Sequence, residues 1–141
     1  MAKRKIPADT ETFHFYNANP KGITNGGDCI DRAISLATGI RWEKVVLVEA
    51  LWEIKNKRKC CDGKDIDSLL QEFGNWIKYP MPKHADGRRY RIWELAEELK
   101  NEKKPVIVSC ANHLTVIKNG KVWDTWNCGG YCVGNYWKRS K

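Results

Sequence analysis

The chain has 141 residues, enough for one domain with its own hydrophobic core and hardly enough for two. Hydrophobic residues make up 42% of it, which argues against disorder, and no run of about 18 apolar residues could form a membrane-spanning helix. The net charge of +8 permits an acidic partner without requiring one, because solubility alone explains a charge of this size.

The first residues are basic, and no apolar stretch follows them, so we do not expect a secretory signal. Residues 1–12 are predicted to be a flexible basic tail. The chain has six cysteines. Without a secretory signal, these cysteines favour reduced thiols and a cytoplasmic protein over a disulfide framework.

Most helices are predicted in the first two thirds of the chain. A short strand at 13–15 and a loop rich in Asn and Gly come first. Apolar residues at helical spacing then indicate four helices, over 28–39, 42–55, 65–74 and 91–101. Asp65 is the expected N-cap of the third helix, and Gly39 and Gly74 are expected to end the first and third.

The last third of the chain is predicted to be β-structure. Strands are expected at 76–79, 105–110, 113–118, 121–126 and 131–137. Asn119-Gly120 between two of them is a strong signal for a two-residue hairpin turn. Helices followed by an antiparallel sheet indicate a single α+β domain over residues 1–141.

Cys29 has the sequence context of a nucleophile. It follows the glycines Gly26-Gly27 and stands in the first turn of a predicted helix. A helix N-terminus favours negative charge and so lowers the pKa of a thiol, and the free amides of the loop could bind an oxyanion. A buried structural cysteine would also suit this position, so the segment alone leaves both interpretations open.

The predicted hairpin places a histidine beside a carboxylate. With a two-residue turn, the numbers of paired residues sum to 239, so Asp124 lies opposite Thr115. His113 is the next residue on the same face of that strand, which makes His113 and Asp124 diagonal neighbours within side-chain reach. A carboxylate that orients an imidazole needs such a placement.

The order Cys29, His113, Asp124, with the cysteine at a helix start and the other two on later antiparallel strands, resembles papain-like cysteine peptidases. The segments Asn19-Pro20-Lys21-Gly22, Gly27-Asp28-Cys29-Ile30-Asp31-Arg32-Ala33, His113-Leu114-Thr115-Val116-Ile117, Gly120, Asp124-Thr125-Trp126 and Tyr136-Trp137 look like small uncharacterised papain-fold proteins of bacteria and their phages. Gly27-Asp28-Cys29 with Arg32-Ala33-Ile34-Ser35 is also similar to the nucleophile helix of ovarian-tumour-type deubiquitinases.

This resemblance implies a papain-like fold, with N-terminal helices packed on a C-terminal antiparallel sheet, and a catalytic triad of Cys29, His113 and Asp124. It implies a cysteine-dependent peptidase or isopeptidase that works through an acyl-enzyme, with no metal and no cofactor. The expected substrate is a protein or peptide. An acidic substrate would be complementary to the positive net charge of the chain. Whether hydrolysis or acyl transfer ends the reaction stays open. The compartment would be the cytoplasm, that of the host if a phage encodes the protein.

Besides the backbone amide of Cys29, a second hydrogen-bond donor to the oxyanion is expected, and the resemblance does not identify it. Papain has a Gln six residues before its cysteine, whereas position 23 here is Ile. Asn19 or Asn25 could donate in its place, because an Asn side chain carries an amide donor. Either residue could equally serve the turn in which it stands.

Two other functions are compatible with the composition. Cys60, Cys61, Cys128 and Cys132 could offer four thiolates to zinc, although adjacent cysteines reach one ion with difficulty. Basic residues cluster at 55–64 and 83–91, and aromatic residues suitable for stacking on bases are abundant. The alternative to an enzyme is therefore a basic nucleic-acid- or protein-binding module, a pseudoenzyme on the same fold.

Overall fold

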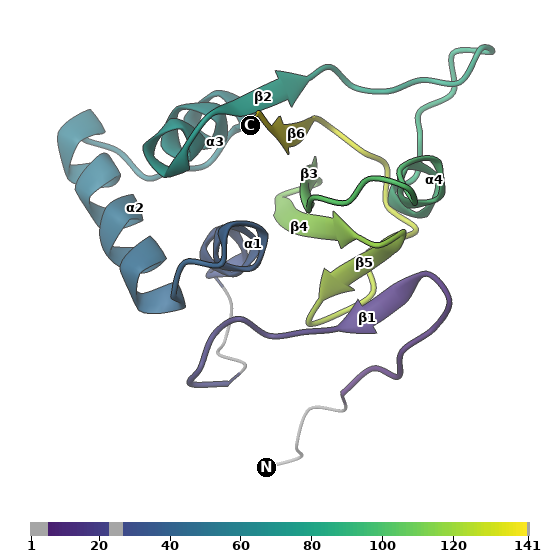
Figure 1. The fold of residues 1–141 in the computed structure, drawn as a ribbon. Helices are drawn as coiled ribbons and strands as arrows, with labels where there is room; N and C mark the ends of the chain where they lie inside the picture. Colours follow the sequence, from purple (N-terminus) through teal and green to yellow (C-terminus); the bar gives the residue numbers. More distant parts are fainter. Residues whose placement is uncertain (1–5, 23–26, 141) are drawn as a thin grey trace.

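The computed structural model describes residues 6–22 and 27–140, which form helices on both faces of a six-stranded sheet (Figure 1). The helices are α1 (Cys29–Thr38), α2 (Trp42–Asn56), α3 (Gly63–Leu70) and α4 (Ile92–Glu98), and a 3-10 turn η1 (Gln71–Phe73) follows α3. The strands are β1 (Phe13–Phe15), β2 (Trp76–Tyr79), β3 (Val106–Cys110), β4 (His113–Lys118), β5 (Lys121–Asp124) and β6 (Tyr136–Arg139). The mixed α+β class predicted from the sequence is confirmed.

The strands lie in the order β1-β5-β4-β3-β6-β2. All neighbouring pairs are antiparallel except β1 and β5, which run parallel. The strand nearest the N-terminus therefore covers the outer edge of the hairpin formed by β4 and β5. That hairpin carries the two predicted catalytic residues of the sheet.

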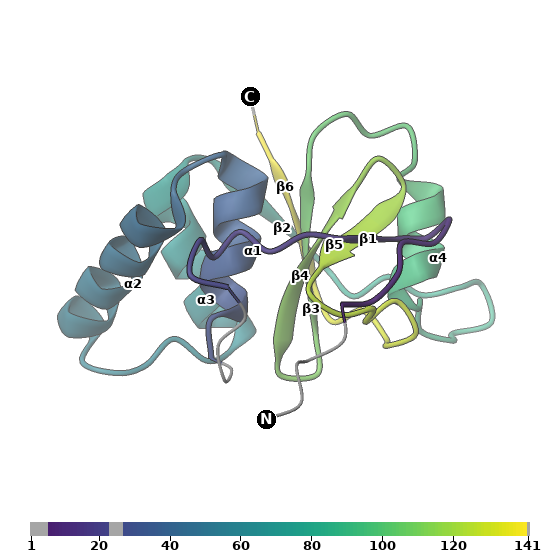
Figure 2. The same ribbon diagram turned by 90° about the horizontal axis from the view of Figure 1, so that it is seen from below.

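Helices cover the sheet unequally, as Figure 2 shows: α1, α2 and α3 lie on one face and α4 lies on the other. The first face meets buried residues such as Leu114 and Val116, and the second meets Ile117 and Val122. Because both faces are covered, the central strands are apolar on both sides. This explains why Val106–Cys110 reads as a continuous apolar run instead of an alternating one.

Helix α1 forms where the sequence predicts it. Its buried side is made of Ala33, Ile34 and Ala37, which recur at helical spacing. Gly39 ends the helix with a φ of 78°, and its N–H donates to the carbonyl of Ser35 at 2.9 Å. A left-handed residue at this position favours glycine, as expected.

The hairpin between β4 and β5 has the predicted register. Val116 pairs with Trp123, and Lys118 pairs with Lys121. The two turn residues, Asn119 and Gly120, have φ values of 54° and 75°, the positive angles of a type I′ turn. The position of every side chain on β4 and β5 follows from this two-residue turn.

Helix α3 begins earlier than predicted. Its N-cap is Asp62, whose carboxylate accepts a hydrogen bond from the N–H of Asp65 at 2.9 Å. Asp65, the predicted cap, lies inside the first turn, where its buried carboxylate pairs with Arg58 at 2.5 Å. Either aspartate could cap a helix. The prediction that Asp65 is the cap was wrong, because Asp62 takes the cap position and Asp65 lies in the first turn of the helix, paired with Arg58.

The chain after β5 also differs from the prediction. β5 ends at Asp124, and β6 covers Tyr136–Arg139 instead of 131–137. The residues between them form a loop in which the N–H of Tyr131 donates to the carbonyl of Cys128 at 3.0 Å. The predicted strand at 131–137 is wrong in its first half: Cys128 and Val133 are buried in this loop, whereas Tyr131 is exposed, and no strand ladder forms before Tyr136.

Part of the predicted tail over residues 1–12 contacts the fold. The carboxylate of Asp9 accepts a hydrogen bond from the backbone of Phe15 at 2.8 Å and lies 2.6 Å from the ring of His14. Residues 1–5 lie outside the described part of the chain.

Candidate active site

Cys29 is the first residue of α1, and its side chain is half-buried. The amide groups of a first helical turn have no partner inside the helix, so they can stabilise negative charge on the thiol or on a bound ligand. Asp28 precedes it as the N-cap residue, and the carbonyl of Asp28 accepts a hydrogen bond from the N–H of Arg32 at 2.9 Å. The helix start therefore holds the sulfur at a defined place.

His113 and Asp124 meet as the hairpin register predicts. His113 Nε2 lies 2.6 Å from Asp124 Oδ2, and their side chains are only 9% and 5% exposed. The ring of Trp126 packs at 4.9 Å from that of His113 and covers the pair. The other carboxylate oxygen of Asp124 accepts the N–H of Thr125 at 2.7 Å, which fixes the carboxylate in place.

The thiol and the imidazole interact directly. Burial acts to raise the pKa of Cys29, but a hydrogen bond with His113 and another from the backbone of Leu114 outweigh it, so the pKa of the thiol is lowered. Burial acts to lower the pKa of His113, yet hydrogen bonds to Asp124, Cys128 and Cys29 raise it to about 11. Both shifts favour a thiolate beside an imidazolium at neutral pH.

A cleft of about 490 Å³ opens in front of this pair. Cys29 and His113 both line it, so the reactive atoms face a space that a ligand can enter. The rest of the wall comes from the two sides of the fold. The helical side gives Ile30 of α1 and Cys60, Cys61, Asp62, Gly63 and Ile66 of the α3 region, and the sheet gives Ser109, Cys110, Asn112 and Leu114. A volume of this size suits a peptide side chain or a small ligand.

The structure assigns Asn19 to the turn before α1. Its side-chain nitrogen donates to Asp28 Oδ2 at 3.0 Å, and its side-chain oxygen accepts the N–H of Lys21 at 2.9 Å. The residue is 3% exposed. These bonds support the turn interpretation, in which Asn19 orients the N-cap of the nucleophile helix. Asn25, the other oxyanion candidate, lies outside the described residues.

Sequence reasoning missed the role of Arg32. Its guanidinium forms an ion pair with Asp28 on the same helix, and its Nη2 lies 3.8 Å from Asp124 Oδ1. The i,i+4 spacing of Asp28 and Arg32 could have indicated the first contact. A continuous polar chain therefore runs from Asn19 through Asp28 and Arg32 to Asp124 and His113.

Sequence reasoning also missed the thiol of Cys128. It is fully buried, and its sulfur lies 3.8 Å from Asp124 Oδ2. Hydrogen bonding with Cys110, together with burial, raises the pKa of Cys128 well above its usual range, whereas the same bond lowers the pKa of Cys110. The sequence could not place Cys128 beside Asp124, because Cys128 lies in the irregular loop that follows β5.

The four-thiolate zinc site, considered from the sequence as an alternative, does not form among the described residues. All six cysteines are free thiols. Within residues 6–22 and 27–140, the donor groups close enough to share an ion are His113 with Asp124 and Cys128, and Cys61 with Asp62 and Asp65. Cys60 and Cys132 belong to neither group, so the four cysteines named from sequence do not converge.

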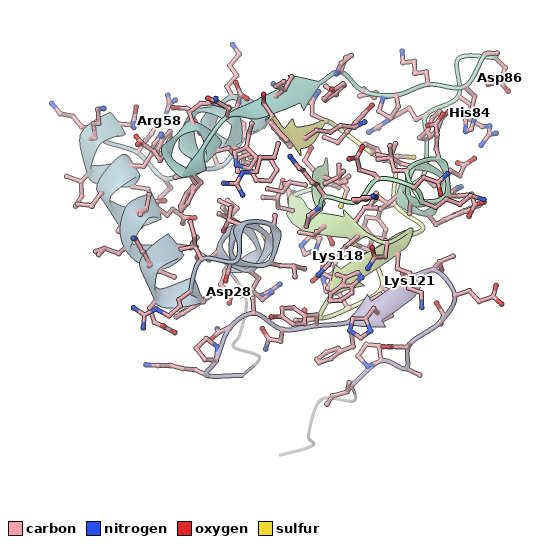
Figure 3. All side chains as sticks on the ribbon, viewed as in Figure 1. Asp28, Arg58, His84, Asp86, Lys118 and Lys121 are labelled. Carbon is pink, nitrogen blue, oxygen red and sulfur yellow. The ribbon has the colours of Figure 1, made fainter. Side chains whose placement is uncertain are left out.

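The two basic clusters lie far apart. Arg58 and Asp86, which mark the segments 55–64 and 83–91, stand at opposite ends of the molecule (Figure 3). Several of their cations are engaged: Arg58 with Asp65, Lys59 with Glu53, and Arg88 with Glu94. The clusters therefore do not form one continuous basic surface.

No family model, curated protein or solved structure matches this chain. None of the helices in the described part of the chain has the length and apolar character needed to cross a membrane.

Proposed function

We propose that this protein is a cysteine-dependent amide hydrolase whose triad is Cys29, His113 and Asp124. One observation carries the proposal: Cys29 and His113 line the same cleft, and His113 Nε2 is held 2.6 Å from a buried carboxylate. The interaction of the thiol with this imidazole also lowers the pKa of Cys29. Nucleophile, base and orienting acid thus stand in the order that covalent catalysis requires.

The chemistry follows from this geometry. The Cys29 thiolate attacks a substrate carbonyl, and the resulting oxyanion is stabilised by the free amides at the start of α1. The His113 imidazolium then gives its proton to the leaving amine as the carbon–nitrogen bond breaks, leaving a thioester on Cys29. Water, or another amine, attacks the thioester with His113 as base and regenerates the thiol. Asp124 fixes the ring and stabilises its charged form.

The proposed architecture is papain-like. Its support is the arrangement of the parts: the nucleophile starts a helix on one side, and the base and acid lie on antiparallel strands on the other. The resemblance of the Cys29 and His113 segments to small papain-fold proteins of bacteria and phages agrees with this. On the same grounds we propose a cytoplasmic protein, in the host where a phage encodes it.

The proposed substrate is a peptide or isopeptide. The cleft lies between helices and sheet and is lined by small and apolar side chains, with Asp62 as its charged member besides the catalytic residues. An acidic protein substrate would meet the basic surface outside the cleft, since the net charge is +8.

The test is site-resolved alkylation with iodoacetamide, read by mass spectrometry across pH 5 to 9. Cys29 should react fastest of the six thiols below pH 7, because its pKa is lowered. His113→Ala should slow Cys29 by about 10²-fold or more. His84→Ala, which removes a histidine bonded to Glu94 away from the site, is the matched control. Equal rates at Cys29 and exposed Cys61, unchanged in His113→Ala, would refute the proposal.

Turnover is measured separately with peptide, isopeptide and cell-wall amide substrates. A trapped acyl-enzyme on Cys29 supports the hydrolase. A reactive Cys29 that never forms an acyl-enzyme, together with salt-sensitive binding of nucleic acid, would instead favour the basic binding module.

A further inference from the structure

The thiol of Cys128 has no part in the proposed mechanism, although it lies beside the catalytic pair. It follows β5 and is fully buried, and its sulfur is 3.8 Å from the oxygen of Asp124 that contacts His113. One nitrogen of His113, one oxygen of Asp124 and the sulfur of Cys128 all lie within 4.8 Å of one another. Three different metal-ligating groups thus converge on one point inside the protein.

The chemistry of these donors favours zinc. A thiolate, an imidazole and a carboxylate are the ligand types that Zn²⁺ uses, and three protein ligands with an open fourth position are typical of its sites. His113 also lines the cleft, so the fourth position can be filled by water from that side. Cys110, which pairs with His113 across β3 and β4, is not among the donor groups that converge.

The second cluster, Cys61 with Asp62 and Asp65, is less suited to an ion. Its oxygens already have partners, because Asp65 is paired with Arg58 and Asp62 caps α3. Cys61 is exposed to solvent. In the first cluster, by contrast, Arg32 approaches only Oδ1 of Asp124, which leaves Oδ2 directed at His113 and Cys128.

We propose that His113, Asp124 and Cys128 bind Zn²⁺, with the fourth position open, and that the bound ion and the catalytic triad exclude each other. A bound ion would take the place of the proton between His113 and Asp124. It would widen their 2.6 Å contact, since zinc bonds of about 2.0–2.2 Å at tetrahedral angles hold ligands further apart. Binding releases the proton of the coordinating thiol. The exclusion rests on the proposed function, whereas the metal site rests on the donors alone.

The experiment uses the chelator-treated full chain titrated with Co²⁺, a spectroscopic substitute for zinc, and then with Zn²⁺ in competition. Wild type should bind one equivalent with a thiolate-to-cobalt charge-transfer band and the intense visible bands of tetrahedral cobalt. Cys128→Ser should lower the affinity by more than the roughly 10–100-fold that loss of an outer ligand contact costs. Cys132→Ser, at a half-exposed thiol four residues along the same loop, is the matched control and should bind as wild type does.

Further variants separate this site from its neighbours. Cys29→Ser should keep the charge-transfer band, because Cys29 is not among the three donors that converge, and Cys61→Ser should keep it as well. Loss of the band in either variant would place the ion elsewhere and overturn the proposal, as would a wild type that binds no cobalt. His113→Gln should lose the site like Cys128→Ser, which keeps the test decisive if Cys128→Ser fails to fold.

The exclusion is tested by alkylation of Cys29 with and without one equivalent of Zn²⁺. Zinc should abolish the rapid reaction in wild type and leave it intact in Cys128→Ser. Equal alkylation with and without bound zinc would refute the exclusion. A Cys29 that is slow even in the metal-free protein refutes the proposed hydrolase and leaves the cobalt titration to decide the metal site by itself.

Discussion

Arg32 of α1 and Asp124 of β5 lie 3.8 Å apart, Nη2 to Oδ1, and join the nucleophile helix to the hairpin that holds the base. The guanidinium is also paired with Asp28, the residue before Cys29, and its side chain is 14% exposed. Its charge helps to lower the pKa of Cys29. One buried cation thus fixes the distance between the two halves of the site and favours the thiolate.

The first prediction concerns Arg32→Lys. Lysine keeps the charge but cannot bond two carboxylates in a fixed fork, so the link between α1 and β5 should loosen. The pH midpoint of Cys29 alkylation should move to higher pH. Arg41→Lys, at an exposed residue outside the polar chain, should leave the midpoint unchanged.

Arg32→Gln removes the charge and leaves Asp28 buried without its partner, which should destabilise the fold by about 3–5 kcal/mol. The lysine variant therefore carries the test of the site, with near-UV circular dichroism as the check of folding. An alkylation midpoint in Arg32→Lys identical to that of wild type would show that Arg32 serves only stability.

Asp124→Asn should leave the nucleophile in place but remove the carboxylate that stabilises the charged ring of His113. The acylation rate should fall by about 10³-fold or more, as expected when the orienting acid of a triad is replaced by its amide. The measurement is single-turnover acylation with an activated peptide ester. Asp86→Asn, at an exposed aspartate far from the site, is the control (Figure 3). Equal rates in the two variants would remove Asp124 from the triad.

The hairpin turn should be sensitive to Gly120→Ala. Gly120 has a φ of 75°, and an added Cβ would lie 3.1 Å from the Cβ of Lys100. The free energy of unfolding should fall by about 1–2 kcal/mol, from strain in the left-handed region and crowding. Urea denaturation measures the loss. Gly130→Ala, where nothing lies within 4 Å and φ is not in the strained range, should be close to neutral.

The meeting of His113 and Asp124 could be predicted from the sequence, because an Asn-Gly turn of two residues fixes the register of every residue on both strands. Helix α1, which begins at Cys29, was equally local, since the apolar spacing indicates the helix and Gly39 marks its end. The contact between Arg32 and Asp124 could not be predicted. It depends on how α1 is placed against the sheet, and apolar packing sets that placement.

The loop after β5 could not be predicted from the sequence. A strand is predicted over 131–137, but residues 131–135 belong to a loop in which Val133 is buried and Tyr131 is exposed. In the same loop Cys128 reaches Asp124, so it does not join Cys60, Cys61 and Cys132, the alternative zinc ligands named from the sequence. Sequence spacing cannot place side chains in an irregular segment, since no period relates one residue to the next.

The last prediction concerns the pair formed by Asp31 of α1 and Glu49 of α2. The carboxyl oxygens Asp31 Oδ1 and Glu49 Oε2 are buried and have no hydrogen-bond partner. Burial and the neighbouring Asp31 raise the pKa of Glu49 to about 8, so we expect Glu49 to keep its proton at neutral pH and to share it with Asp31. A carboxyl whose pKa is raised in the folded state stabilises it fully below pH 4.5, and that contribution is lost as pH rises toward 8.

Glu49→Gln supplies a permanently neutral donor in place of the protonated carboxyl. It should therefore match wild type at pH 4 and raise the melting temperature by about 3 °C or more at pH 8.5, since 1 kcal/mol corresponds to a few degrees in a domain of this size. Scanning calorimetry from pH 4 to 8.5 measures the difference. Glu72→Gln, at an exposed residue, removes the same charge without burial and should show no such rise. A gain for Glu49→Gln that is constant across this range would contradict a shared proton, because only a group that ionises between these pH values makes the difference grow.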